Sequence, residues 1–76
     1  MPAEQPAWVR TRRELIGARI RTAREDAGLS QVELGEQAGV DHKTIHRVEY
    51  GKSDPGLGTL LLIADAIDVP LAELVR

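Results

Sequence analysis

Residues 30–51, SQVELGEQAGVDHKTIHRVEYG, decide the fold of this chain. Ser30 and Glu33 have the spacing of a capping box, in which the serine hydroxyl accepts from a backbone N–H of the first helical turn while the glutamate reaches back to the serine N–H. This pattern predicts a short helix that starts at the box and runs through Ala38. Gly39 suits the left-handed conformation that ends such a helix.

A second helix is expected directly after this first one. Asp41 is a favoured N-cap residue, and it predicts a helix over 42–50 that Gly51 ends. Ile45 and Val48 are the apolar residues that would hold its inner side against the core. Two helices joined by a tight turn that contains glycine are typical of a helix-turn-helix.

The outer side of the second helix carries polar and basic side chains, namely His42, Lys43, Thr44 and Arg47. An exposed helix about 10–12 Å across fits the major groove of B-DNA, which is about 12 Å wide. Lys and Arg can donate there to guanine O6 and N7, and Thr and His can hydrogen-bond bases or phosphates. The pattern therefore favours a DNA-recognition helix over a merely solvated helix face.

The N-terminal part of the chain predicts one longer helix with two possible starts. Thr11 and Glu14 have the spacing of another capping box, which predicts a helix over about 11–27. Pro6 could instead open the helix earlier, with Trp8 joining its apolar face. The sequence leaves both starts open.

Two further helices are expected near the C-terminus. A helix over about 57–67 is nearly all apolar and is therefore predicted to be buried. Pro70 then starts a last turn or two, whose apolar residues could supply a dimer contact: Leu71, Leu74 and Val75. We find no convincing segment that alternates apolar and polar residues, so the predicted fold is all-α, a compact arrangement of five helices.

The composition is that of one small globular domain. The chain has 76 residues, no cysteine and a formal net charge of −2. The lack of cysteine excludes disulfides, thiolate metal sites and a cysteine nucleophile. The longest apolar run, Leu60 to Ala64, is far below the roughly 18 residues of a membrane span, and the first residues do not form a secretory signal. We therefore expect a cytoplasmic protein with no membrane partner.

A negative net charge argues mildly against a nucleic-acid partner, but its distribution matters more. Residues 10–24 contain six arginines and one glutamate, and residues 42–53 are also net positive. The acidic residues gather in 25–41 and after residue 53. The sum over the whole chain thus conceals local basic surface.

Taken together, these residues resemble the lambda-repressor-like helix-turn-helix family of phage repressors and XRE-type regulators. The resemblance covers about Leu15 to Leu74 and joins several short motifs: Leu15-Ile16-Gly17, Arg24, Leu29-Ser30-Gln31, Glu33-Leu34, Gly39-Val40, Thr44-Ile45, Glu49-Tyr50-Gly51-Lys52, Pro55 and Asp68-Val69-Pro70-Leu71. It implies a five-helix domain whose recognition helix is the helix over 42–50.

The resemblance also implies which residues contact DNA: Gln31, His42, Lys43, Thr44, Arg47, Tyr50, Lys52 and Ser53. The glutamine opens the first helix of the motif and would contact a phosphate or an adjacent base. The residues at 42, 43 and 47 would read bases, and Thr44 would contact a base or a phosphate. The last three would touch the DNA backbone from the following loop.

The resemblance also implies one structural ion pair, and the sequence departs from the family pattern at Gly35 and Asp41. Arg24 and Glu49 match a partly buried ion pair that ties the first helix to the end of the recognition helix. Gly35 stands where the family has a small alanine, which costs about 1 kcal/mol of helix propensity. Asp41 brings a negative charge close to the turn that would face DNA.

The first residues of the chain leave alternatives open. Residues 1–10 are expected to be an N-terminal arm or an extension of the first helix, ahead of a DNA-binding domain over 11–76. Arg10, Arg12 and Arg13 could grip the DNA backbone, as N-terminal arms do in other DNA-binding proteins, or they could simply solvate the start of the helix.

Neither a metal site nor a catalytic site is expected. His42 and His46 lie four residues apart, a spacing that can hold a metal on one helix face, but the sequence offers no third ligand. There is no phosphate-cradling glycine loop, and no base is evident beside Ser30 or Ser53. We therefore expect no cofactor and no enzyme activity.

The sequence thus predicts a transcriptional regulator that binds double-stranded DNA sequence-specifically. It would act as a repressor, binding a pseudo-palindromic operator as a homodimer through the helix at 42–50. Trp8 would pack or join the dimer rather than stack on a base. The alternative is a protein-interaction module, such as the antitoxin of a toxin pair or an accessory factor that binds a co-regulator, and the acidic surface favours it.

Overall fold

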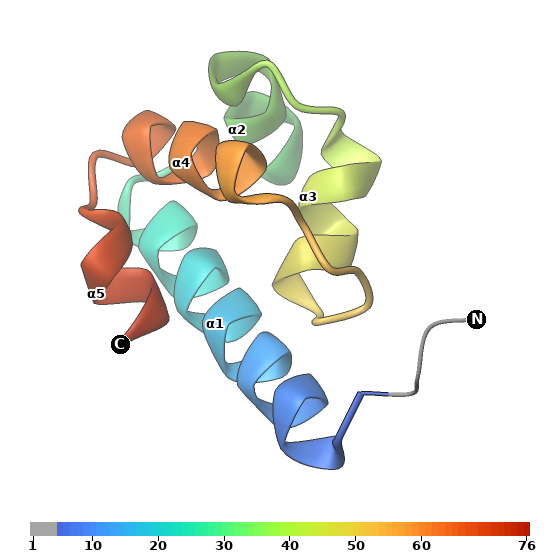
Figure 1. Cartoon of the computed structure of the whole chain (residues 1–76). Helices are drawn as coiled ribbons and strands as arrows, with labels where there is room; N and C mark the ends of the chain where they lie inside the picture. The colour runs from blue at the N-terminus through green and yellow to red at the C-terminus, as the bar shows by residue number, and fades with distance from the viewer. Residues whose placement is uncertain (1–4) are drawn as a thin grey trace.

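The computed structural model describes residues 5–76 and contains, within that range, five α-helices and no strand. The helices are α1 (Ala7–Asp26), α2 (Gln31–Ala38), α3 (His42–Glu49), α4 (Leu57–Ala66) and α5 (Leu71–Val75), as labelled in Figure 1. The prediction of an all-α fold with five helices is confirmed. The observed bounds lie close to the expected ones everywhere except at the start of α1.

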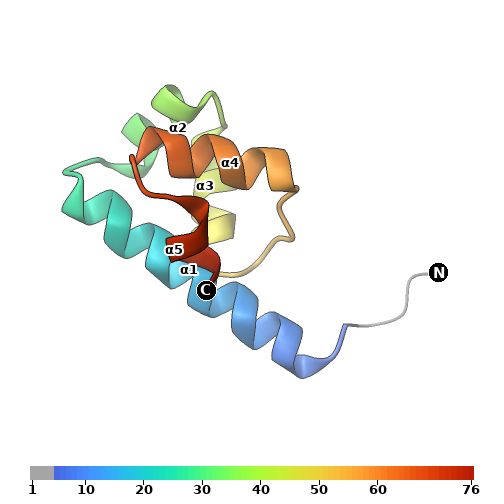
Figure 2. The same ribbon diagram turned by 60° about the vertical axis from the view of Figure 1, so that its left-hand side comes forward.

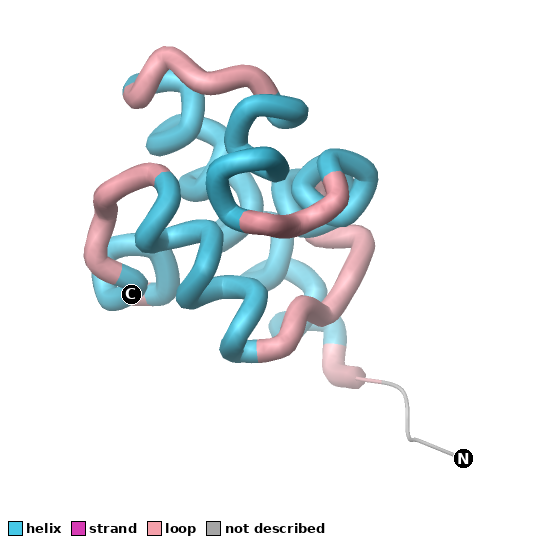
Figure 3. Tube along the Cα trace, turned by 90° about the horizontal axis from the view of Figure 1, so that it is seen from above, coloured by secondary structure: helices cyan, strands magenta, loops and turns pink. Residues whose placement is uncertain are grey.

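The helices enclose a single small core. α1 packs against α3 and α5, while α2 packs against α3 and α4, and α4 also touches α5. The first turns of α1 extend beyond the other helices, as Figures 1 and 2 both show. Figure 3 shows from above how the loops connect the helices. One fully buried aliphatic side chain comes from each of the first four helices: Ile20, Leu34, Ile45 and Ile63.

α1 begins earlier than the Thr11 capping box predicts. Pro6 is the N-cap residue, and its carbonyl accepts a hydrogen bond from the Val9 N–H (3.0 Å). The Thr11 hydroxyl instead donates to the Ala7 carbonyl one turn earlier (3.2 Å). Proline is well tolerated at a helix start, because its missing N–H would have no helical partner there. The prediction of a start at Thr11 is therefore wrong, and the earlier start is observed.

Two expectations about the outside of the fold need correction. Trp8 does not join the apolar face that packs on the core, since it is 67% exposed. α4 is not wholly buried either: Ile63 points into the core, but three leucines are 65%, 50% and 51% exposed, namely Leu57, Leu61 and Leu62. The core is too small to cover every side of an apolar helix.

α5 is held to the core by the residues that we expected at a dimer contact. Leu74 is buried, and Leu71 and Val75 are partly buried against the core. Leu74 is therefore unavailable to a second chain in this fold. Within the part of the chain that the structure describes, no helix is both long and apolar enough to cross a membrane.

Candidate nucleic-acid interface

α2 begins with two reciprocal hydrogen bonds. The backbone N–H of Glu33 donates to Ser30 Oγ (3.0 Å), and the backbone N–H of Ser30 donates to Glu33 Oε1 (2.9 Å). The pKa of Glu33 lies below its ordinary value. The main cause is the hydrogen bond from the Ser30 backbone and the second is the interaction with the Ser30 side chain, because both favour the ionised carboxylate. The predicted capping box is confirmed, and it satisfies the backbone N–H of Glu33 in the first turn of α2.

The turn between α2 and α3 depends on two glycines. Gly39 has a φ of 70°, in the left-handed region that the sequence predicts for it. The Val40 N–H donates to the Gly35 carbonyl (2.9 Å), and a Cβ atom placed on Gly35 would lie only 2.5 Å from the Val40 carbonyl oxygen. Gly35 therefore does more than weaken α2: its missing side chain makes room for the turn.

The inner side of α3 ends on a buried ion pair. Arg24 and Glu49 are 8% and 1% exposed, and two guanidinium nitrogens, Nε and Nη2, donate to the carboxylate oxygens (2.6 and 3.1 Å). A third nitrogen donates to the Leu29 carbonyl (2.8 Å). The hydrogen bond with Glu49 raises the pKa of Arg24 above its ordinary value. This bidentate pair ties α1 to the end of α3.

Gln31 lies at the junction of α2 and α3. Its amide nitrogen donates to Glu49 Oε1 (3.1 Å) and lies 3.5 Å from Nδ1 of His46. The buried carboxylate thus orients the glutamine that the family resemblance implies as a phosphate contact. Charge-assisted hydrogen bonds thus connect Arg24 to Glu49 and Glu49 to Gln31, from the interior to the surface.

The outer side of α3 is polar and accessible. His42, Lys43 and Arg47 are exposed and Thr44 is half-buried. Arg47 Nη2 donates to the Thr44 hydroxyl oxygen (3.2 Å), a bond to a neutral group that leaves the guanidinium charge uncompensated. These are four of the residues that the resemblance implies for base or phosphate contacts, and the structure brings them together on one helix.

Asp41 occupies the N-cap position of α3 without capping it through its side chain. Its carbonyl oxygen accepts from the N–H groups of Thr44 and Ile45 (2.9 and 3.1 Å), but the carboxylate makes no cap hydrogen bond. One carboxylate oxygen lies 3.7 Å from His42 Nδ1. The prediction that Asp41 is the N-cap residue of this helix is confirmed, although its carboxylate takes no part in the cap.

The two histidines of α3 have different neighbours. His42 lies beside Asp41, whereas His46 lies between Gln31 and the ring of Tyr50. Across residues 5–76, no three His, Cys, Asp or Glu side chains form a group that could hold a metal ion.

Tyr50 connects α3 to α1 through aromatic contacts. Its ring lies 4.8 Å from the ring of His46 between centroids, and the guanidinium carbon of Arg21 lies 5.0 Å from the Tyr50 centroid. A cation over an aromatic face is attracted by the ring electrons. Sequence reasoning missed Arg21, although its position one turn before Arg24 places both arginines on the same face of α1.

Of the three residues expected to touch the DNA backbone after α3, Tyr50 and Lys52 are exposed and Ser53 is not. Lys52 is exposed, and its backbone N–H donates to the Arg47 carbonyl (2.8 Å). The Ser53 hydroxyl is buried and has no hydrogen-bond partner among the described residues. It lines a cavity of about 120 Å³ together with Pro55 and Leu60. Ser53 is thus turned inward, away from the backbone contact that the resemblance implies.

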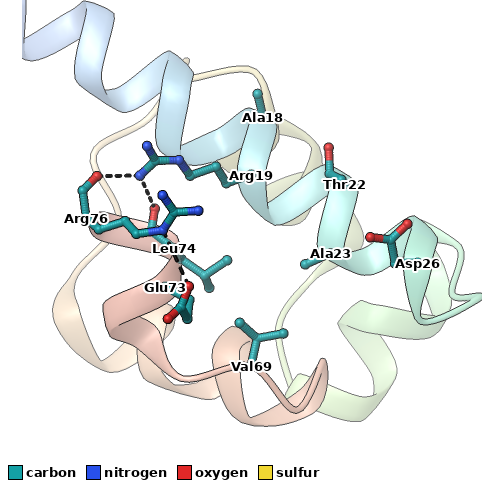
Figure 4. A pocket seen from close by; sticks show the side chains of 9 residues that line it. All are labelled: Ala18, Arg19, Thr22, Ala23, Asp26, Val69, Glu73, Leu74 and Arg76. Atoms are coloured by element: carbon teal, nitrogen blue, oxygen red, sulfur yellow. Dashed lines mark hydrogen bonds and ion pairs between the residues drawn. The ribbon is translucent and has the colours of Figure 1, made fainter.

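A hollow lined by two arginines and two carboxylates lies between α1 and α5. The hollow is open and has a volume of about 330 Å³. Figure 4 shows Arg19 and Arg76 at one end of it. Arg19 donates to the carbonyl oxygens of Leu74 (3.3 Å) and Arg76, while Arg76 pairs with Glu73 (3.4 Å). Arg12 also donates to the last two carbonyls (2.9 Å each). These arginines bind the C-terminal end of α5, so their hydrogen bonds stabilise the fold.

Comparisons with known proteins agree with this geometry. A helix-turn-helix family model matches residues 20–74. The chain is 38% identical over 58 residues to a helix-turn-helix-type transcriptional regulator of Sinorhizobium fredii, which covers 76% of this chain and 30% of that protein. It is 30% identical over 60 residues to the immunity repressor protein of Bacillus phage phi105, which covers 79% of this chain and 42% of the repressor.

A solved structure is similar over most of both chains. The restriction-modification controller protein C.AhdI from Aeromonas hydrophila superposes with a TM-score of 0.78 at 34% identity, covering 80% of this chain and 92% of that one. The curated relatives are longer, since the chain spans only 30% to 42% of the length of the two named above.

Proposed function

Because the chain belongs to the lambda-repressor-like helix-turn-helix family of transcriptional regulators, we propose that it binds double-stranded DNA sequence-specifically and represses transcription. One observation carries the proposal: His42, Lys43 and Arg47 are exposed on α3, while the opposite side of that helix is buried. A helix held in this way can enter the major groove with its basic side chains first.

Lys43 and Arg47 are the residues that we propose to read bases. They lie four residues apart, so both project from the same face of α3. Each can donate to O6 and N7 of a guanine, and a good bidentate contact contributes about 1–3 kcal/mol of discrimination against a wrong base. The bond from Arg47 to Thr44 restrains the guanidinium before DNA arrives.

Gln31 and Lys52 are the residues that we propose to set the position of the protein on the DNA backbone. Gln31 lies at the start of α2, where free backbone N–H groups favour a phosphate. Its hydrogen bond to Glu49 links that contact to the buried ion pair. Phosphate contacts of this kind set orientation without reading sequence.

The direct test is selection of bound fragments from random duplex DNA, followed by titration of the selected duplex. Arg47→Ala should cost about 1–3 kcal/mol on that duplex and should relax base preference at one position. Arg76→Ala removes the same charge at the other side of α1 and should leave the affinity nearly unchanged. Equal weakening on every sequence would reduce Arg47 to a phosphate contact.

Lys52 has a separate test, because a phosphate contact shows itself in the salt dependence. Lys52→Ala should reduce the magnitude of the negative slope of log K against log salt by about one unit. It should weaken binding to all duplexes by the same factor. An unchanged slope would contradict this role.

Dimerisation is part of the proposal, since one helix reads few base pairs and two helices can read half-sites about 34–36 Å apart. We place the contact on the exposed leucines of α4, Leu57, Leu61 and Leu62, and the occupant is a second copy of the chain. α4 carries a single charged residue, Asp65, so its leucine face can meet its own copy without repulsion between like charges on that face.

The dimer contact can be tested by sedimentation. Leu61→Asp should convert a dimer to a monomer, whereas Val32→Asp, at an exposed apolar position on α2, should not. A wild-type chain that stays monomeric while bound to its selected duplex would contradict the dimer.

We also propose that residues 11–76 form the DNA-binding domain and that residues 7–10 extend it through α1. Because a regulator acts where the DNA lies, we propose that it works in the cytoplasm. Repression is the outcome that the phage immunity repressor suggests by similarity. A reporter placed behind the selected sequence should lose expression when the protein is present, and increased expression would contradict repression.

A further inference from the structure

We propose that a basic hollow at the first turns of α1 binds a DNA backbone phosphate that lies beyond the segment read by α3. The hollow is formed by Arg10, Arg13 and Lys52. This inference rests on the proposed function, because it extends the same DNA-binding surface. It assigns a binding role to the part of α1 that projects past the other helices (Figure 1).

The hollow lies where the loop after α3 meets α1. It has a volume of about 540 Å³ and is lined by Arg10, Arg13, Glu14, Tyr50, Gly51 and Lys52. A neighbouring hollow of about 530 Å³ shares both arginines and continues along α1 to Gln5. Both hollows are open, as a contact with the outside of a duplex requires.

Close packing holds the two sides of the hollow together. A Cβ atom on Gly51 would lie 2.8 Å from the Glu14 Cα and 2.9 Å from the Glu14 nitrogen, so the turn is pressed directly on the α1 backbone. Gly51 also has a φ of 67°, which a side chain would make costly. Lys52 is therefore carried next to the arginines of α1 by backbone contacts.

Arg13, one of the three cations of the hollow, has neutral hydrogen-bond partners. Arg13 Nε donates to the Gly51 carbonyl (3.2 Å), and Arg13 Nη1 donates to Gln5 Oε1 (2.7 Å). Within residues 5–76, the recorded ion pairs leave out Arg10, Arg13 and Lys52. Glu14 is the one carboxylate in the lining, so three cations face one anion. Arginines held by neutral groups keep their full charge for an external anion.

The hollow is continuous with the proposed recognition surface, which identifies the anion. Tyr50 lines the hollow, and its ring also contacts that of His46 on α3. Arg21 over the Tyr50 ring extends the basic strip toward the Arg24–Glu49 pair. A duplex seated on α3 carries one negative charge per about 1.7 Å of its axis, so a phosphate outside the base-read segment is the anion that such a strip would meet.

The test measures salt dependence on a 30-base-pair duplex of random sequence by fluorescence anisotropy. Arg10 is exposed, so Arg10→Ala should leave thermal unfolding unchanged. It should reduce the magnitude of the negative slope of log K against log salt by about 0.9. Between 50 and 200 mM salt, the factor by which the variant loses affinity should then be roughly 3.5 times smaller than the factor for the wild type. Arg10→Lys should keep the slope, because it keeps the charge.

Arg76→Ala is the matched control, since it removes one arginine that pairs with Glu73 on α5. Its slope should equal that of the wild type. An Arg10→Ala slope equal to that of the wild type, or an equal loss in Arg76→Ala, would overturn the inference while the proposed function stands. If the wild type binds neither this duplex nor the selected duplex at 50 mM salt, the proposed function fails, and this inference with it.

Discussion

α2 and α3 are both eight residues long and lie in one motif, yet their polar groups are satisfied in opposite ways. α2 is capped by Ser30 and Glu33, and its Gly35 is pressed against the following turn. α3 has no side-chain cap, and on its exposed side Arg47 bonds only to the neutral Thr44 hydroxyl, while His42 lies beside Asp41. Only its inner side, which ends in Glu49, is fixed.

This difference separates positioning from contact. Groups that already have partners inside the protein lose little when DNA approaches, but they also offer little to it. Groups left to solvent can exchange water for bases and phosphates at the interface. Substitutions of the capping and buried residues of α2 and of the inner side of α3 should therefore change stability, and substitutions on the outer side of α3 should change binding.

The largest effect is expected where α3 is anchored. Glu49→Ala would leave the Arg24 guanidinium buried without its carboxylate, and loss of one partner of a buried pair costs about 3–5 kcal/mol. Urea unfolding measures this change. Arg47→Ala on the outer side should change the free energy of unfolding by less than about 0.5 kcal/mol. Similar losses for both variants would erase the distinction between the two sides of α3.

The next effect concerns the close approach of α2 to its turn. Gly35→Ala should destabilise the fold by about 1–3 kcal/mol, because the added methyl would meet the Val40 carbonyl. Gly58→Ala in α4 is the matched control, since its Cβ would meet nothing within 4 Å and alanine favours the helix. The two thermal midpoints should move in opposite directions; a stabilised Gly35→Ala would show that the turn is not tightly packed.

A smaller effect compares the two helix starts directly. Ser30→Ala removes a side-chain cap and should cost about 1 kcal/mol. Asp41→Ala removes a carboxylate that makes no cap bond, so it should leave stability nearly unchanged while strengthening DNA binding through loss of a negative charge. Chemical unfolding and duplex titration of both variants provide the measurements. Equal destabilisation would mean that Asp41 caps α3 after all.

The smallest effect is a dependence of stability on pH. The pKa of Glu33 is lowered in the folded chain, so its stabilising contribution is complete above its unfolded value and is lost as pH falls through the folded value. The wild type should thus lose more stability than Glu33→Gln between pH 6 and acidic pH. Parallel pH profiles of the two proteins would contradict the capping role of the carboxylate.

Much of the motif could be predicted from local sequence. The Ser30–Glu33 spacing, the left-handed Gly39 and the end of α2 depend on residues a few positions apart, and each was predicted correctly. The start of α1 was ambiguous because two residues, Pro6 and Thr11, both suit a helix start. Only packing along the whole helix decides between them.

The remaining differences arise from tertiary structure. From the sequence alone, Gly35 is only a residue of low helix propensity. The structure shows that the Val40 carbonyl lies where its side chain would be. Ser53 lies in a polar loop, yet the loop folds its hydroxyl inward. The contact between Arg21 and Tyr50 joins residues far apart in sequence, as does the hollow around Arg10. No local pattern specifies such contacts, because they depend on how helices cross.

Methylation protection with dimethyl sulfate on the selected duplex tests the central claim most directly. The reagent modifies guanine N7 in the major groove and adenine N3 in the minor groove. If α3 reads bases through Lys43 and Arg47, the wild type should protect specific guanine N7 atoms, and Arg47→Ala should lose protection at one of them. Protection confined to adenine N3, or guanine protection that survives in Arg47→Ala and Lys43→Ala alike, would contradict it.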